Sequence, residues 1–75
     1  MTKIKSECIA VESSFVSSLW YNYTSRKLIV IYKSGSLYEY SDVKLKTFKK
    51  IKKAKSIGVA LHKEIFKIYS FTKIK

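Results

Sequence analysis

The chain is poor in the residues that interrupt or staple a fold. Its 75 residues include no proline, two glycines and one cysteine, Cys8. A single cysteine excludes a disulfide-stapled secreted scaffold, because such a scaffold needs paired cysteines. No linker or internal repeat divides the sequence. We therefore expect one small domain over residues 1–75, with a core at about residues 8–69 and short basic termini.

Long apolar runs are also missing. The longest, residues 28–32 (LIVIY), has the length of a strand, far below the about 20 residues that a membrane-spanning helix needs. The first residues contain no apolar segment of signal-peptide length. With one free cysteine and no export signal, we expect a cytoplasmic protein with no membrane partner, working in the host cytoplasm if it is viral.

Acidic residues are scarce. Asp and Glu number 5 against 16 Lys and Arg, which gives a formal net charge of +11. Hydrophobic residues make up 47% of the chain, too many for a disordered basic tail. All the basic residues except Arg26 are lysines, and lysine suits contact with phosphates better than base-specific reading. AT-rich coding bias is the alternative explanation of the lysine excess.

Motifs for catalysis or metal binding are absent. Ser13, Ser14, Asp42 and His62 occur without a nucleophile elbow or a glycine-rich phosphate loop. His62 has no second histidine and no nearby cysteine to share a metal. We expect no enzymatic activity, no metal and no cofactor.

The first half of the chain predicts strands and the second half predicts helices. Alternating β-branched and aromatic residues indicate strands at residues 14–23, 27–33 and 37–40, with a tight turn at Gly35. Pairing by residues 7–11 is a further option. A phase change between Val16 and Leu19 indicates a bulge near Ser17 and Ser18.

Apolar residues recur at three and four positions after Asp42, which is typical of helices. Residues 43–54 form the first helix, with Asp42 as its N-cap and a buried stripe of Leu45, Phe48 and Ile51. Ser56 caps the second, whose predicted buried stripe is Ile57, Leu61, Ile65 and Ile68. Residues 69–75 are either a last strand or a disordered end. The expected fold is α+β: an antiparallel three-stranded β-meander followed by two α-helices packed on one face.

In this order of elements the chain resembles the KTSC domain, a small domain found at the C-terminus of some lysyl-tRNA synthetases and in stand-alone proteins of bacteria and phages. The resemblance rests on Val11-x-Ser13-Ser14, the 28–32 strand, Gly35-x-x-Tyr38-x-Tyr40 and Ala54-x-Ser56-x-Gly58. Tyr38 and Tyr40 correspond to the family's central Tyr-x-Tyr. The resemblance implies this fold and hints at RNA as a partner. The chain departs from the family at Lys44, where proline is usual, and at Trp20, where glycine is usual.

Two groups of residues are candidate binding sites. The first is a run of lysines around the first helix, of which four are expected on the face opposite the buried stripe; the run is Lys44, Lys46, Lys49, Lys50, Lys52, Lys53 and Lys55. The second is Trp20, expected on the other sheet face beside Ile29 and Ile31 as a partner or dimer patch. Tyr32, Tyr38 and Tyr40 are expected to share a sheet face, either packed under the helices or as a stacking platform for bases.

We therefore predict a basic, non-enzymatic nucleic-acid-binding module, with RNA favoured, that contacts phosphates through the lysine-rich helix and stacks or docks through Trp20. The alternative is a small phage- or virus-type effector that binds an acidic host protein through the basic helix or the Trp20 patch. The sequence leaves open whether the protein is a monomer or a homodimer.

Overall fold

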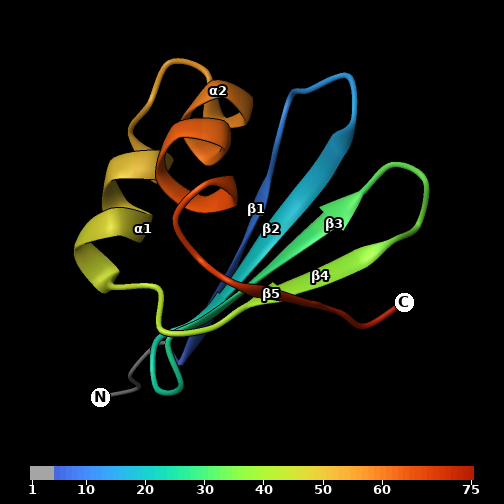
Figure 1. Cartoon of the computed structure of the whole chain (residues 1–75). Coiled ribbons are helices and arrows are strands. Elements are labelled where there is room, and N and C mark those ends of the chain that lie inside the picture. Colours follow the sequence, from blue (N-terminus) through green and yellow to red (C-terminus); the bar gives the residue numbers. More distant parts are fainter. Residues whose placement is uncertain (1–4) are drawn as a thin grey trace.

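Five antiparallel strands form one sheet, and the helices pack on one face of it (Figure 1). The computed structural model describes residues 5–75. The strands lie side by side in chain order, and the helices are inserted between the fourth and fifth strands. The elements are β1 (Ser6–Ala10), β2 (Val16–Asn22), β3 (Lys27–Tyr32), β4 (Leu37–Tyr40), α1 (Leu45–Lys52), α2 (Ile57–Leu61), the π-helical turn η1 (His62–Phe66) and β5 (Phe71–Lys73).

The α+β class and the antiparallel meander are confirmed, but the number of strands was wrong. The predicted strands are the three central ones, β2, β3 and β4. The optional pairing at residues 7–11 is present as β1, and the C-terminal tail forms β5. Both are short edge strands, and all three residues of β5 are exposed. Such strands are held by backbone pairing with a neighbour, so hydrophobic periodicity does not reveal them.

The predicted bulge in β2 is present. Val16 is paired with Tyr32 whereas Ser18 is paired with Ile31, so one extra residue lies in β2 between them. The bulge lets Val16 and Leu19 both face the core, where each is fully buried. It also determines that Trp20 points to the opposite face of the sheet.

Two turns depend on residues with special backbone requirements. Gly35, between β3 and β4, has a φ of 96°, a value that side chains with a Cβ rarely adopt. Between β2 and β3, the Asn22 side-chain oxygen accepts hydrogen bonds from the backbone of Thr24 and Ser25 at 2.8 and 3.0 Å. This Asx turn satisfies two backbone N–H groups of the turn and closes the hairpin next to the Asn22–Lys27 pair.

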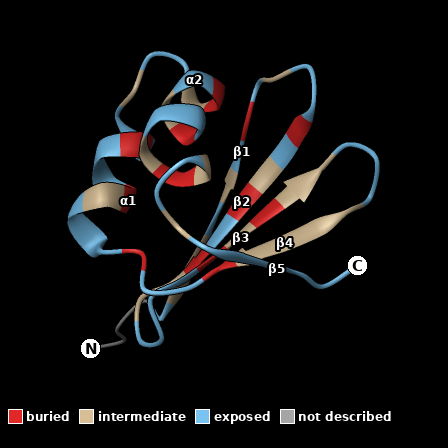
Figure 2. Ribbon diagram, viewed as in Figure 1, coloured by how far each residue is buried: buried red, intermediate tan, exposed pale blue. Residues whose placement is uncertain are grey.

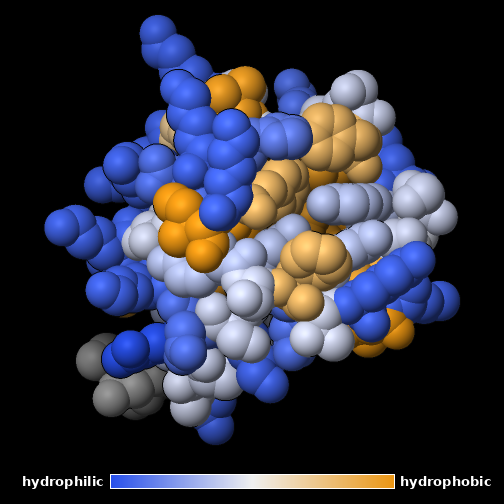
Figure 3. Space-filling model, viewed as in Figure 1, coloured by the Kyte–Doolittle hydropathy of each residue, from blue (hydrophilic) through white to orange (hydrophobic). Residues whose placement is uncertain are grey.

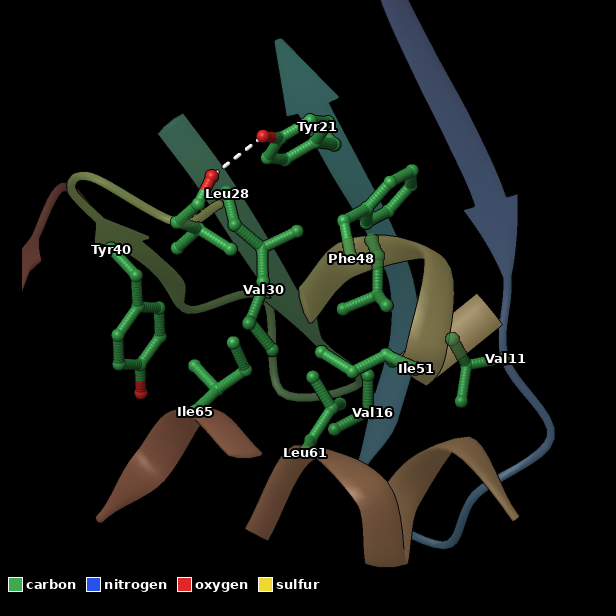
Figure 4. Close-up of a cluster of buried hydrophobic side chains, with 12 residues drawn as sticks. Val11, Val16, Tyr21, Leu28, Val30, Tyr40, Phe48, Ile51, Leu61 and Ile65 are labelled. Atoms are coloured by element: carbon green, nitrogen blue, oxygen red, sulfur yellow. Dashed lines mark hydrogen bonds between the residues drawn. The ribbon is translucent and has the colours of Figure 1, made fainter. Parts of the chain in front are cut away.

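Helix α1 begins later than the sequence indicates, and Asp42 is not its N-cap. Asp42 adopts a left-handed φ of 58°, and the cap position is Lys44, whose side chain makes no capping bond. The reason lies in Val43, the residue between Asp42 and Lys44. Its N–H donates to the Arg26 carbonyl at 2.9 Å. Its carbonyl accepts the hydrogen bond of the buried Tyr21 hydroxyl at 2.6 Å, the dashed line in Figure 4. These bonds hold Val43 outside the helix.

The second helix starts as expected and ends differently. The Ser56 side chain accepts a hydrogen bond from the Val59 N–H at 3.4 Å, which confirms the predicted cap. The helix widens into η1 and ends at Phe66, so the 3.6-residue period does not extend to Ile68. Ile68 is 65% exposed, and its predicted place in the buried stripe was wrong.

The core lies between the sheet and the helices. Buried positions follow the faces of α1, α2 and η1 that look toward β2 and β3 (Figure 2). Phe48 and Ile51 of α1 are fully buried as predicted, whereas Leu45 is 40% exposed. Their sheet-side and helix-side partners are Val11, Val16, Leu19, Tyr21, Leu28, Val30, Tyr40, Val43, Leu61 and Ile65.

Candidate nucleic-acid interface

The lysine run projects from α1 and the segments at its two ends. Phe48 and Ile51 lie on the face of α1 that packs in the core, so the other faces of the helix are exposed to solvent. All seven lysines are exposed, as the helical period predicts for most of them. Their charges are therefore held on a stable scaffold, within reach of a partner in solution.

Two of the seven lysines have carboxylate partners within the chain. Lys50 Nζ lies 3.5 Å from a Glu64 oxygen, and Lys52 Nζ lies 2.7 Å from a Glu7 oxygen. The sequence did not predict these ion pairs, because they join residues far apart in the chain. Within residues 5–75, no carboxylate lies within 4.0 Å of the other five, which are Lys44, Lys46, Lys49, Lys53 and Lys55.

The Lys52 pair belongs to a structural network that joins β1, β2 and α1. The Tyr23 hydroxyl donates to the other oxygen of Glu7. Lys52 and then Tyr23 hold the pKa of the Glu7 carboxyl below its ordinary value, because both hydrogen bonds favour the charged form. The same bond raises the pKa of Tyr23 to about 12. Lys52 therefore helps to hold α1 against β1, and its charge is already partly neutralised by Glu7.

Two hollows border the lysines. One, of about 460 Å³, lies between the end of α1 and the second helix, and its lining includes Lys50, Lys55 and Lys63 together with the Glu64 carboxylate. A second, of about 320 Å³, lies against Lys49, Lys52 and Lys53. Lys50 is paired with Glu64 and Lys52 with Glu7. A phosphate in the first hollow would therefore meet Lys55 and Lys63, and one in the second hollow would meet Lys49 and Lys53.

Trp20 occupies the sheet face that carries no helix. It is paired with Ile29 across β2 and β3, and with Cys8 across β1 and β2, so these side chains share one face. Trp20 is 39% exposed, and Ile29 and Ile31 are partly buried. The structure therefore places the three residues of the predicted patch together, on the face opposite the helices and away from α1.

The three tyrosines share the helix side of the sheet, as the alternation predicts. Tyr40 is 3% exposed and packs in the core, and Tyr32 stacks on Tyr38 with ring centroids 5.2 Å apart. Burial is the main cause that raises the pKa of Tyr32 and of Tyr40, so their hydroxyls stay neutral. Packing explains Tyr40 fully and leaves Tyr32 and Tyr38 partly open to solvent.

The sequence did not single out the aromatic residues that extend this group. Phe15 lies against Tyr32, and Phe71 of β5 lies against Tyr38, with centroids 6.2 and 5.1 Å apart. Phe15 and Phe71 are 56 positions apart in the sequence numbering, a separation that no local pattern can bridge. The option of a last strand at residues 69–75 was the signal in the sequence that pointed to Phe71, and β5 confirms that option.

Two of the residues considered for catalysis, Ser13 and His62, have structural partners. The Ser13 hydroxyl accepts the backbone N–H groups of Phe15 and Val16 at 3.3 and 3.4 Å. The His62 ring contacts Phe15 and Phe66. Across residues 5–75, no three His, Cys, Asp or Glu side chains gather in a way that could hold a metal. In the same part of the chain, no helix has the length and apolar character needed to cross a bilayer.

The meander and helix pair define a small α+β domain with one basic helix. The family model for the KTSC domain matches residues 12–69, and the chain belongs to the KTSC domain family. A crystal structure of a KTSC domain protein from Yersinia pestis is similar, with a TM-score of 0.83 and 23% sequence identity over 93% of this chain and 99% of that one. No curated protein matches the chain.

Proposed function

We propose that this protein is a small non-enzymatic nucleic-acid-binding module, with RNA as its favoured partner, that works in the cytoplasm. The observation that carries the proposal is the group of five lysines around α1 with no carboxylate nearby in residues 5–75; we call it the lysine face and define it as Lys44, Lys46, Lys49, Lys53 and Lys55. Phosphates would neutralise these charges and release counterions.

The stability of α1 does not account for these lysines. Basic side chains in the last turn, such as Lys49, interact favourably with the helix dipole. At the other end, Lys44 and Lys46 stand where acidic residues are favoured, and the first turn contains none. Pairs such as Lys46–Lys50 and Lys49–Lys53 repel at i,i+4 by about 0.2–0.5 kcal/mol each. A bound polyanion would turn this repulsion into attraction.

The test is a charge reversal of the lysine face. We expect Lys49→Glu/Lys53→Glu to weaken binding of a fluorescent single-stranded RNA about tenfold or more, measured by anisotropy at low salt. The matched control, Lys5→Glu/Arg26→Glu, makes the same change in net charge at exposed positions outside α1, one just before β1 and one in the turn between β2 and β3. We expect it to bind nearly as the wild type does.

Salt dependence supplies a second measurement. Five phosphate contacts with a single strand predict a log–log slope of about −3.5 between affinity and salt concentration, and the double reversal should flatten it by about 1.4. Failure of the wild-type protein to bind oligonucleotides in dilute buffer would refute the proposal. Equal losses in the two double variants would also refute it, because net charge rather than the lysine face would then control binding.

A second candidate is an effector that binds a host protein through the open sheet face. The observation that favours it is Trp20, 39% exposed beside Ile29 on the face without helices. Under this proposal Trp20→Ala abolishes co-purification of one specific protein at high salt, and Lys49→Glu/Lys53→Glu does not. A concentration-dependent mass by light scattering that Trp20→Ala removes would assign the same face to a homodimer.

A further inference from the structure

Seven aromatic rings form a closed circuit on the helix side of the sheet. Each ring contacts the next, with centroids 4.9 to 6.2 Å apart. Phe15, Tyr32, Tyr38 and Phe71 line the sheet side of the circuit. Tyr40 of β4 continues the sheet side, and Phe66 and His62 of η1 close the circuit along the helix side. Because every ring contacts two others, the circuit joins three strands, the loop before β2 and η1.

The circuit is only partly buried. Tyr40 anchors it in the core, but Phe15 is 40% exposed and Phe71 is 56% exposed. Figure 3 shows hydrophobic side chains gathered between the helices and the free end of the β3–β4 hairpin, with hydrophilic side chains on both sides. Two exposed phenylalanines beside two partly buried tyrosines make a contiguous aromatic surface, a feature that marks binding sites.

Lysine, serine and glutamate side chains border the circuit. Lys73 is paired with Tyr38 across β4 and β5, so its side chain stands on the same face as the rings. Phe15 and His62 also border a hollow of about 270 Å³ whose other walls include the hydroxyl-bearing Ser14. Glu12 borders this hollow too and would repel phosphate there. On this face the rings offer flat apolar contacts and Lys73 offers a positive charge.

We infer that the aromatic circuit is a stacking site for unpaired nucleobases, and that the protein binds single-stranded nucleic acid in preference to duplex. The inference rests on the proposed function, since the lysine face supplies the phosphate contacts. Every base presents a π-face to an aromatic ring, whereas paired bases inside a helix present none. The circuit therefore supplies the strand selectivity that lysines alone lack.

The experiment compares two ligands and two kinds of variant. Anisotropy is measured with a labelled single-stranded RNA of about ten nucleotides and with a hairpin duplex of equal length and charge, whose two strands are joined by a non-nucleotide linker so that no base is unpaired. Phe71→Leu and Phe15→Leu keep apolar bulk at exposed positions and remove the stacking ring. We expect each to weaken single-strand binding about fivefold or more, and to leave duplex binding unchanged. Phe71→Tyr, which keeps an aromatic ring at this position, should bind the single strand as tightly as the wild type does.

The outcomes separate this inference from the proposed function. Wild-type affinity for the single strand in both leucine variants overturns the stacking site and leaves the lysine face intact. Equal affinity of the wild-type protein for single strand and hairpin also overturns it. Quenching of Trp20 fluorescence by the single strand, together with no effect of Phe71→Leu, would place the bases on the opposite sheet face and refute the circuit. Binding of neither ligand would refute the proposed function itself.

Discussion

The hydroxyl of Tyr21 is the group whose removal best tests why α1 begins where it does. Tyr21 and Val43 are both fully buried, and the hydroxyl donates to the Val43 carbonyl at 2.6 Å. Tyr21→Phe keeps the ring stacked on Phe48, whose centroid is 4.3 Å away, and removes only the donor. The Val43 carbonyl is then buried without that partner.

The expected cost follows from that unsatisfied carbonyl. Leaving one buried acceptor without its hydrogen bond destabilises a protein by about 1–3 kcal/mol. We expect Tyr21→Phe to lower the free energy of unfolding by about 1–2 kcal/mol, measured by urea denaturation followed by circular dichroism. For a domain of this size each kcal/mol shifts Tm by about 4–8 °C, so Tm should fall by about 4–16 °C.

A matched control is Tyr38→Phe, which removes a hydroxyl that has no hydrogen-bond partner in the described part of the chain. It should change the free energy of unfolding by less than about 0.5 kcal/mol. Amide exchange adds a local readout: Tyr21→Phe should speed exchange at Val43, whose N–H is bonded to Arg26. A Tyr21→Phe protein as stable as the control would refute the assignment of the helix start to this bond.

Three further predictions concern stability. The pKa of Glu7 is lowered in the folded state, so the stability that its carboxylate contributes is present above its ordinary pKa of 4.5 and is lost as pH falls through the folded pKa. On acidification, Tm of the wild type should therefore fall more steeply than Tm of Glu7→Gln. Ultraviolet titration of Glu7→Gln should show a pKa of Tyr23 below its wild-type value of about 12. Urea denaturation should show that Ile65→Val lowers the free energy of unfolding by about 0.5–1.5 kcal/mol and that Ile68→Val lowers it by less than about 0.5 kcal/mol. The reason is that the Ile65 side chain is fully buried whereas Ile68 is 65% exposed. Equal losses in the two variants would contradict the end of the helix at Phe66. Gly35→Ala meets no steric obstacle but requires a φ of 96°, so thermal denaturation should show a loss of about 1 kcal/mol or more, and an unchanged Tm would show that the turn can adopt another geometry.

The central part of the fold could be predicted because its signals are local. Alternation located β2, β3 and β4, Gly35 located one turn, and Ser56 located the start of the second helix. The bulge was also predictable, since Val16 and Leu19 cannot both face one side of a regular strand. The KTSC resemblance gave the same order of elements, and the family match confirms it.

The features that the sequence missed depend on residues distant in the chain. Asp42 has the chemistry of an N-cap, but the bonds of Val43 to Tyr21 and Arg26 place the helix start after it. Ile68 fits the helical period, but the helix ends before it. In each case a tertiary contact or a helix end outweighs a local preference of about 1 kcal/mol.

For the candidate site, the sequence by itself determined the excess of positive charge and its concentration on one helix, because both follow from composition and from a period of 3.6 residues. Only the tertiary structure decided which lysines remain without carboxylate partners among residues 5–75, because Glu7 and Glu64 reach Lys52 and Lys50 from other elements. The aromatic circuit was likewise decided by folding. Its rings come from both ends of the chain, and only the pairing of β5 with β4 brings Phe71 to Tyr38 and Tyr40.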